Sequence, residues 1–243
     1  MENLPESNRG FHADGLRRRV IGCATVIEEM LPFIPADIPY EILDFGLHLN
    51  PGELKKILQE KIDQTSQNAD VLMLGYGLCS LAVVNLRATT ATLIIPRVDD
   101  CISVFLGSAR AYKEQSSKEP GTYYLTKGWI EVGDSPFEEF PRLVEKYGEQ
   151  KAARMIHLSL KNYTRLAFIN TGNADLTRYQ DYGRKNAAQF NLRYEEIDGT
   201  PELVKKMIFG PWDEDFVIIP PGQVVRYEDF TTHQKSYHET PAN

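Results

Sequence analysis

The sequence predicts an α/β fold of mostly parallel sheets with flanking helices, arranged as two Rossmann- or flavodoxin-like halves joined by an irregular linker. Two observations predict it, together with a general rule of chain topology. Short apolar runs typical of strands alternate with amphipathic segments typical of helices. Alternation of this kind makes right-handed crossovers and parallel strands. The pattern is interrupted once, in the middle of the chain, and then resumes.

The composition is that of an ordinary globular protein. The 243 residues are 42% hydrophobic and 25% charged, which argues against a disordered or collagen-like chain. The net charge of -7 argues against a broad basic face for nucleic acid. No apolar run is long enough to span a membrane, and the N-terminus lacks the apolar core of a secretory signal. We expect a cytoplasmic protein with reduced cysteines that binds neither nucleic acid nor membrane.

The first half, residues 17–115, contains predicted strands with short helices between them. The strands are expected at residues 17–23, 40–45, 69–75 and 90–96. The third run is almost entirely apolar, which is typical of a strand buried on both faces, and the fourth is β-branched and aliphatic. Helices are expected at residues 24–33, 51–65, 78–86 and 99–112. The second helix is the clearest, because Asn50 and Pro51 suit its N-cap and first turn.

The linker, residues 116–160, is expected to be extended over residues 121–132, with a turn at Lys127–Gly128, and helical in two segments over residues 137–160. The second, smaller half covers residues 161–230. Its strands are expected at residues 166–169, 192–197 and 215–219, and its helices at residues 174–189 and 201–208. A single sheet that holds all of these strands is an open alternative. The polar ends, residues 1–16 and 231–243, are expected to lie outside the packed fold.

Each cysteine lies just past a predicted strand. Cys23, Cys79 and Cys101 follow the first, third and fourth strands. In a flavodoxin-like order 2-1-3-4 these strands are neighbours about 4.8 Å apart, and ligands bind beyond their carboxyl ends. We expect the three thiols to converge on a metal and helix N-termini to lower their pKa values. Three protein ligands leave a fourth position open, as in catalytic sites. The alternative is that each cysteine simply packs in the core.

Further polar residues are expected along the same edge. His48 follows the second strand and is a candidate fourth ligand or proton carrier, or an ordinary half-buried histidine. Tyr76 and Gly77 belong to a Gly-Tyr-Gly segment whose backbone can approach a ligand closely. Arg97 is a candidate for binding an anionic group, with a surface or capping ion pair as the alternative. Asp100 either orients a ligand or caps a helix.

The linker and the second half supply other candidate substrate-binding residues. Thr171 and Gly172 follow a predicted strand and resemble an anion-binding loop at a helix N-terminus. Tyr123, Tyr124 and Trp129 are candidates for the wall of a pocket and for a cage around a quaternary ammonium group. Packing in the core is the alternative for each of these rings.

Several segments together resemble the domain-of-unknown-function family numbered 1638, over about residues 18–225. They are GYGLC at 75–79, IPRVDDC at 95–101, LGS at 106–108, PGTYYLTKGWIE at 120–131, CATVIEEM from residue 23, LHLNP around residue 48 and GPWDEDFVIIPPG at 210–222. The resemblance implies relatives in anaerobic bacteria and methanogens, often encoded near corrinoid-dependent methyltransferases. It therefore implies such proteins as partners in one-carbon metabolism. Where relatives often have histidine, this chain has Asp99.

Two functions from different classes follow. The first is a metal-binding protein, in which the three cysteines hold an iron–sulfur cluster or zinc with His48 nearby, accessory to or acting in corrinoid-dependent methyl transfer. The second is a protein without a metal that binds a corrinoid, a methylated amine or a methyltransferase in a cleft between the halves. A thiol transferase with one nucleophilic cysteine is a third possibility. Catalytic residues and enzymatic activity stay open, since no nucleotide-binding, hydrolase or zinc-protease motif is present.

Overall fold

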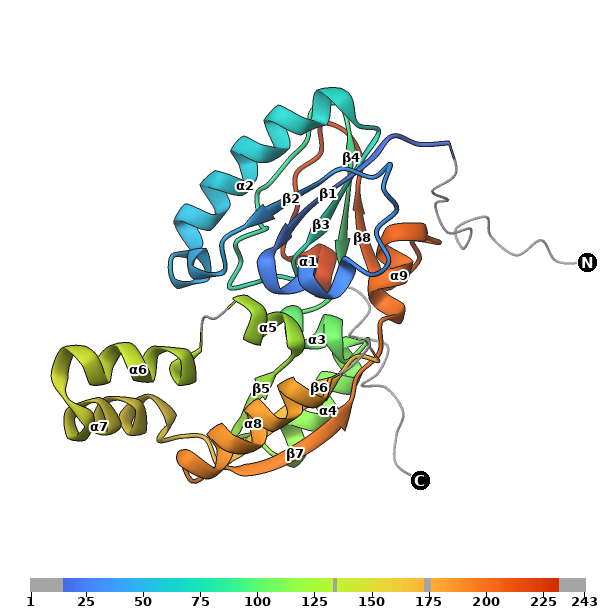
Figure 1. The fold of residues 1–243 in the computed structure, drawn as a ribbon. Coiled ribbons are helices and arrows are strands. Elements are labelled where there is room, and N and C mark those ends of the chain that lie inside the picture. Colours follow the sequence, from blue (N-terminus) through green and yellow to red (C-terminus); the bar gives the residue numbers. More distant parts are fainter. Residues whose placement is uncertain (1–14, 133–134, 173–175, 232–243) are drawn as a thin grey trace, which may run out of the picture.

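The computed structural model describes residues 15–132, 135–172 and 176–231, which form two sheets with flanking helices (Figure 1). The first sheet has the order β2-β1-β3-β4-β8. Its strands are β1 (Arg18–Cys23), β2 (Tyr40–Leu43), β3 (Val71–Gly75), β4 (Thr92–Pro96) and β8 (Phe216–Ile219). β8 pairs antiparallel with β4 and the other pairs are parallel. The predicted mixed α/β class and the order 2-1-3-4 are confirmed.

The second sheet is smaller and entirely parallel. It has the order β5-β6-β7, with β5 at Thr122–Leu125, β6 at Arg165–Asn170 and β7 at Arg193–Asp198. The alternative of one sheet holding all the strands is therefore wrong. β8 comes after the second sheet in the chain but completes the first sheet, so the chain crosses between the two sheets twice.

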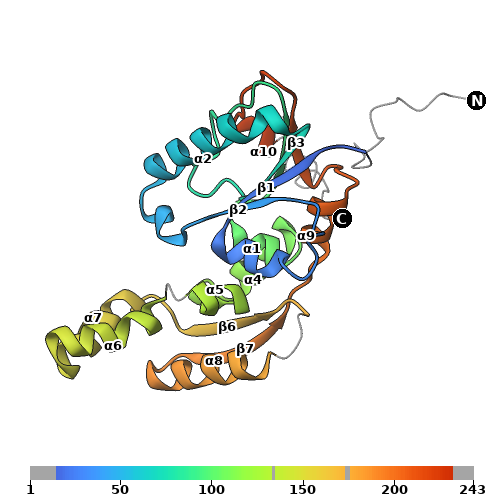
Figure 2. The ribbon, with the colours of Figure 1, turned by 45° about the horizontal axis from the view of Figure 1, so that its top comes forward.

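The helices cover the faces of both sheets. They are α1 (Ala24–Met30), α2 (Pro51–Thr65), α3 (Cys101–Phe105), α4 (Ala109–Lys118), α5 (Lys127–Val132), α6 (Pro136–Tyr147), α7 (Glu149–Leu160), α8 (Thr177–Gln189), α9 (Glu202–Phe209) and α10 (Glu228–Thr231), with 3-10 turns η2 (Phe45–Leu49) and η3 (Ser66–Asn68). α2 lies on one face of the first sheet, and α1 and α9 lie on the other (Figure 2). α6 and α7 form a hairpin at the outer end of the second sheet. Among the described residues, no helix has the length and apolarity to cross a membrane.

The pattern of burial follows the sequence. Every residue of β3 is buried, as an all-apolar strand in the centre of a parallel sheet requires. α2 has the predicted bounds, and the Asn50 side chain accepts a hydrogen bond from the Glu53 amide. Its buried residues Leu54, Leu58 and Ile62 recur at helical spacing and form one apolar face. The two helical segments predicted over residues 137–160 correspond to α6 and α7.

The helix predicted over residues 78–86 is wrong. This segment is a series of turns in which Cys79, Ser80, Leu81 and Asn85 have φ values of 44°, 56°, 67° and 72°. Positive φ values are incompatible with a right-handed helix. The apolar residues of this segment instead pack in the core, where Ala82, Val83 and Leu86 are buried.

Two other predicted elements differ. The helix predicted over residues 99–112 is divided into α3 and α4 at Gly107, which has a φ of 86° and lies against Thr200. Residues 121–132 are extended only through β5 and then form α5, in place of the predicted turn at Lys127–Gly128. The Thr126 hydroxyl accepts a hydrogen bond from the Trp129 amide at 3.2 Å and begins the helix.

Candidate functional site

The carboxyl edge of the first sheet brings together the loops that carry the three cysteines. Cys23 ends β1, Cys79 lies in the turns after β3, and Cys101 begins α3 after β4. β1, β3 and β4 are consecutive neighbours in the sheet. All three cysteines are free of disulfide bonds and buried, with exposed fractions of 1%, 7% and 7%. The predicted placement on one edge is therefore observed.

Backbone hydrogen bonds hold the Cys79 loop against the loop that leads to Cys101. The amides of Leu78 and Cys79 donate to the carbonyls of Val98 and Asp99, each at 2.9 Å. Gly77 permits this contact, because a Cβ atom there would lie 2.5 Å from the Val98 carbonyl oxygen. The close backbone approach predicted at Gly77 thus exists, but its partner is the Val98 loop.

The three thiols lie close enough to influence one another electrostatically. Burial above all, with smaller contributions from the nearby Cys23 and Asp100, raises the pKa of Cys79 to about 12. Burial also raises the pKa of Cys101 well above its usual range, with added contributions from Cys79 and Cys23. The pKa of Cys23 is raised for the same first reason, although a contact with the Thr25 hydroxyl at 3.3 Å opposes the shift.

The expectation that these pKa values are lowered is therefore wrong. Loss of water around a buried thiol penalises the thiolate, and the charged neighbours are acids or other thiols. The helix N-terminus at Cys101 does not outweigh this, since α3 is only 5 residues long. Without a bound cation the three thiols are protonated at neutral pH.

Tyr76 lies between the end of β3 and Cys79 and carries a buried hydroxyl group. Its side chain is 1% exposed, and the hydroxyl has no hydrogen-bond partner in the part of the chain that is described. Burial raises the pKa of Tyr76, and Cys23, Cys79 and Cys101 raise it further. The hydroxyls of Tyr124 and Tyr182 also lack a well-formed hydrogen bond, but each lies near polar side chains of its own surroundings. Tyr76 is thus the buried orphan hydroxyl of the cysteine site.

His48 packs against Tyr76. Its ring stacks on the Tyr76 ring, with centroids 6.0 Å apart and planes at 27°. His48 Nδ1 lies 2.9 Å from the Phe45 carbonyl oxygen. When Nδ1 carries the proton it donates to this carbonyl, and Nε2 is then the ring nitrogen with the lone pair. The structure therefore places the predicted His48 beside the cysteine site.

A row of aromatic rings continues from His48 toward the second sheet. The Phe45 ring lies 5.1 Å from His48 and 5.8 Å from Trp129, and Trp129 lies 6.1 Å from Phe105, measured between centroids. Trp129 belongs to α5, which packs against α1 of the first sheet. Trp129 therefore joins the two sheets close to the cysteine edge.

The predicted cage of Tyr123, Tyr124 and Trp129 is not formed. Tyr123 packs edge-on against Phe137 and Tyr163, whereas Tyr124 packs against Tyr112. Adjacent residues of a strand point to opposite faces, so these two tyrosines cannot face the same cation. Here the core alternative explains the rings.

Asp100 and Arg97 have structural partners. Asp100 Oδ1 accepts hydrogen bonds from the amide and hydroxyl of Ser103, so it is the N-cap of α3. Arg97 donates to the carbonyl oxygens of Glu214 at 2.8 Å and Phe216 at 2.7 Å, and also to that of Asp229. The Arg97 guanidinium thus binds backbone carbonyls of the C-terminal segment and holds that segment against the end of β4. The sequence analysis had predicted that it contacts an anion instead.

Thr171 and Gly172 lead to a residue that the sequence analysis missed. Gly172 donates its amide to the Asn170 side chain, and the Thr171 hydroxyl donates to Glu29 Oε2 at 2.7 Å. Glu29 of α1 is buried and also accepts from the Gly128 amide at 3.1 Å. Its carboxylate therefore joins α1 to α5 and to the loop after β6. The available signal was a glutamate on the apolar face of a short helix, beside Val26 and Met30.

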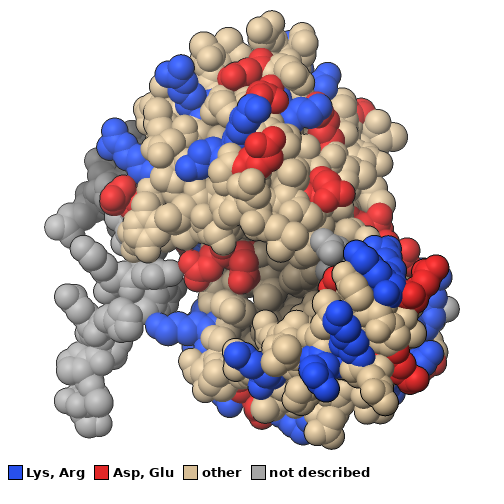
Figure 3. Space-filling view, turned by 90° about the vertical axis from the view of Figure 1, so that its left-hand side faces the viewer, with Lys and Arg blue, Asp and Glu red and all other residues tan. Residues whose placement is uncertain are grey.

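Two further observations bear on where a ligand could bind. In the described part of the chain, no group of three or more His, Cys, Asp or Glu side chains stands in an arrangement that could hold a metal ion. A hollow lies between the upper part of the molecule, built on the first sheet, and the lower part, with acidic side chains at one end (Figure 3).

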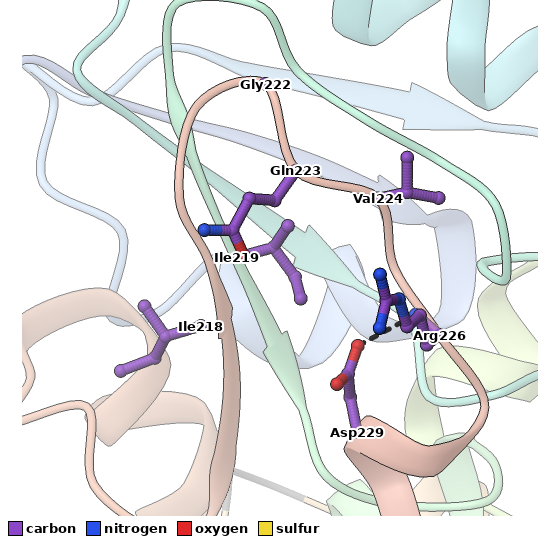
Figure 4. Close-up of a pocket in the computed structure, with 7 residues that line it drawn as sticks. All are labelled: Ile218, Ile219, Gly222, Gln223, Val224, Arg226 and Asp229. Carbon is purple, nitrogen blue, oxygen red and sulfur yellow. Dashed lines mark hydrogen bonds between the residues drawn. The ribbon is translucent and has the colours of Figure 1, made fainter.

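A separate pocket of about 440 Å³ lies away from the cysteines (Figure 4). It is lined by Ile218, Ile219, Gly222, Gln223, Val224, Arg226 and Asp229. Ile219 pairs with Leu93 near the start of β4, whereas the Asp229 carbonyl accepts from Arg97 just past the end of β4, so the pocket lies along the β8 edge of the first sheet. The Arg226 amide donates to Asp229 Oδ2 at 2.8 Å within it. None of the predicted site residues lines this pocket.

Comparison with known proteins gives one match. A family model described as "Protein of unknown function (DUF1638)" matches residues 42–208, which is more than half of the chain. No curated protein and no solved structure matches. The matched range includes His48, Tyr76, Cys79 and Cys101, and begins after Cys23.

Proposed function

The chain belongs to the DUF1638 family of proteins of unknown function, and from this premise we propose that it is a metal-binding protein whose three cysteines hold an iron–sulfur cluster or a zinc ion. The observation that carries the proposal is the grouping of all three thiols of the chain at one sheet edge. They come from three separate segments, are buried, and interact electrostatically with one another. A single buried cysteine is ordinary, but three that share one site form a donor set for a soft cation.

The side chains must move for the site to close around a cation. As they stand, the described residues do not form a metal-holding arrangement. A rotation about the Cα–Cβ bond moves a sulfur between staggered positions without moving the backbone. The backbone itself is fixed, since hydrogen bonds join the Cys79 and Asp99 loops and Cys23 ends a paired strand. Binding therefore requires rotation of cysteine side chains on a rigid frame.

The choice of cation follows from the ligands. Thiolates favour zinc, copper(I) and iron–sulfur clusters over the hard cations. Three protein thiolates leave one coordination position for water, substrate or His48. A cluster with one open iron and a zinc ion with one open position both fit this count. The role in corrinoid-dependent methyl transfer and the cytoplasmic location stay predictions, the first drawn from the resemblance alone.

The test is metal and sulfide analysis with a visible spectrum on protein purified without oxygen. Wild type is compared with Cys79→Ala and with Ser159→Ala, a control on α7 outside the site. About three to four irons per chain with sulfide, absent from Cys79→Ala only, establishes a cluster. One zinc per chain with the same dependence establishes a zinc site. Absence of bound metal from wild type under these conditions overturns the proposal.

Single substitutions at all three cysteines separate the metal site from thiol chemistry. A shared metal predicts that Cys23→Ala, Cys79→Ala and Cys101→Ala each lose the metal. A nucleophilic cysteine predicts that one thiol is indispensable and the other two are not. The pattern of loss across the three variants decides between them.

A further inference from the structure

The first sheet ends at β2, an edge strand that exposes apolar side chains. β2 (Tyr40–Leu43) is the first strand in the order of the sheet and lies at its left-hand side in Figure 1. Tyr40 is 43% exposed and Ile42 is 53% exposed. An exposed apolar edge strand is a template for pairing with another strand, so proteins often cover such an edge or place charges on it.

The other edge strands of the described chain are protected in these ways. β5 is almost entirely buried. At β8 the Arg97 guanidinium donates to the Phe216 carbonyl at 2.7 Å. β7 carries charged side chains, which are Arg193, Glu195, Glu196 and Asp198. β2 therefore differs from the other edges in leaving apolar side chains open to solvent.

The backbone of β2 offers unused hydrogen-bonding groups along its outer side. The Val20 amide of β1 donates to the Pro39 carbonyl at 3.0 Å, and Val20 lies opposite Tyr40 in the register. In a parallel ladder only alternate residues of a strand bond to a given neighbour. Tyr40 and Ile42 therefore turn their N–H and C=O groups away from β1. No hydrogen bond within the described residues takes up these groups.

The side chains of β2 divide between the two faces of the sheet. Glu41 makes an ion pair with Lys61 of α2 at 2.8 Å, so Glu41 faces the side of α2. Adjacent residues of a strand point to opposite faces, which places Tyr40 and Ile42 on the side of α1. Leu31, the C-cap of α1, is 40% exposed. The edge thus combines apolar surface with a single charge that is already paired.

We propose that β2 pairs antiparallel with β2 of a second copy of this chain, so that two five-stranded sheets join into one. The occupant of the edge has to be an extended backbone, because the outward groups are donors and acceptors at strand spacing. A second copy supplies such a strand, and its outward groups are self-complementary about a two-fold axis. Although the chain carries a net charge of -7, Glu41 is neutralised by Lys61, so two β2 strands meet without an unpaired charge. The dimer does not depend on the proposed metal site.

The charges also select the register of the pairing. With the two-fold axis at Glu41, two glutamates would lie directly opposite each other, which is destabilising. With the axis at Ile42, that residue lies opposite Ile42 of the second copy and exchanges both backbone hydrogen bonds with it. Glu41 then lies opposite Leu43. A stable dimer buries about 800 Å² per partner, more than a strand of 4 residues supplies, so we expect a weak and reversible dimer.

The first experiment measures molar mass by sedimentation equilibrium on the full chain under reducing conditions, from about 1 µM to about 1 mM. We expect wild type to dimerise reversibly. Ile42→Lys should weaken dimerisation at least about tenfold, because it places two like charges opposite each other. Leu158→Lys is the matched control, since Leu158 lies on α7 and is 59% exposed, and it should dimerise as wild type does. Circular dichroism checks that each variant is folded.

A second experiment tests the register without adding charge. Ile42→Cys places two new thiols on residues whose Cα atoms lie about 5.5 Å apart in the proposed pairing, which is within the range of a disulfide. Mild oxidation should link Ile42→Cys into covalent dimers. It should not link Leu158→Cys, or wild type, in which the three cysteines are buried.

Each result bears on the pairing of β2 alone. Wild type that stays monomeric at the highest concentration overturns the proposal and leaves the edge to a strand of a different protein. A dimer that Ile42→Lys does not weaken has its interface elsewhere, and this also overturns the proposal. Equal yields of covalent dimer from Ile42→Cys and Leu158→Cys contradict the pairing at Ile42. The proposed metal site is tested separately by metal analysis.

Discussion

At the scale of single residues, the position of two cysteines depends on a glycine that allows two loops to pack closely. Gly77 lets two loops touch, and those loops carry Cys79 and Cys101. The thiols are then buried together, and burial raises their pKa values. The arrangement of the thiols at this edge therefore depends on Gly77, which has no side chain.

The substitution Gly77→Ala tests this dependence. A Cβ atom at residue 77 would lie 2.5 Å from the Val98 carbonyl oxygen, which is backbone and cannot move aside easily. We expect a loss of about 1–3 kcal/mol in the free energy of unfolding, measured with urea. The control is Gly52→Ala on α2, where the nearest atom is an Asn50 side-chain oxygen at 3.6 Å. Gly52→Ala should be neutral or stabilising, and equal losses in both variants would contradict the explanation.

The raised thiol pKa values predict that the metal-free protein is less stable at high pH. The pKa of Cys79 is raised from its ordinary 9.0 to about 12, so the folded state favours the protonated thiol. This contribution is fully present below pH 9 and is lost as the pH rises toward 12. The free energy of unfolding of wild type should therefore fall across this range more steeply than that of Cys79→Ala. Parallel pH profiles for the two proteins would show that Cys79 is not shielded from water.

At the scale of elements, the two sheets are joined by a contact between two helices, one from each sheet. α1 follows β1 of the first sheet, α5 follows β5 of the second, and the two helices contact each other. Glu29 joins them through the Gly128 amide and reaches the loop after β6 through Thr171. The hydrogen bonds of this buried carboxylate thus specify which residues of α1, α5 and the loop after β6 face one another, and apolar packing alone would not specify this.

Neighbouring glutamates on α1 provide a matched test of this joint. Glu29→Ala leaves the Gly128 amide and the Thr171 hydroxyl without their observed acceptor, and we expect a loss of about 2–3 kcal/mol in the free energy of unfolding. Glu28 makes a half-exposed ion pair with Lys127 at 3.2 Å, so Glu28→Ala should lose less than about 1 kcal/mol. Urea unfolding of both variants makes the comparison. Similar losses would mean that burial of Glu29 does not matter.

At the scale of the whole molecule, the path of the chain binds the sheets into one structure. The second sheet is inserted between β4 and β8, which pair with each other in the first sheet. Both ends of this insertion are therefore held by paired strands of the first sheet. Trp129, Glu29 and Thr200 add contacts between the two sheets, which separate unfolding of the second sheet would break. We therefore expect both sheets to unfold in a single cooperative transition.

The two tryptophans report on this separately. Trp212 is buried in the first core, where its ring nitrogen donates to the Met207 carbonyl, and Trp129 lies between the sheets. In Trp129→Phe the fluorescence reports on the first sheet, and in Trp212→Phe it reports on the joint. Each variant's fluorescence transition in urea should coincide with its own transition followed by circular dichroism. A joint that opens at lower urea than the secondary structure would show that the sheets unfold independently.

Much of the fold could be predicted from the sequence, because its signals are local. The apolar run of β3, the Asn50–Pro51 start of α2 and the alternation of strands and helices need no knowledge of distant residues. Parallel strands put the residues that follow them on one edge, which placed the cysteines together, and the order 2-1-3-4 was supposed by analogy with flavodoxin-like sheets. The sequence by itself therefore determined the mixed α/β class, the central strands and the edge on which the thiols lie.

Other properties depend on contacts between distant segments, and only the tertiary structure decided them. The left-handed turns at Cys79–Leu81 replace a predicted helix where the loop after β3 bonds to the loop after β4. The rise in the thiol pKa values, the antiparallel place of β8, the carbonyl partners of Arg97 and the burial of Glu29 have the same origin. Local sequence fixes which backbone shapes are accessible, but burial and hydrogen-bond partners are set by whichever segments the fold brings alongside.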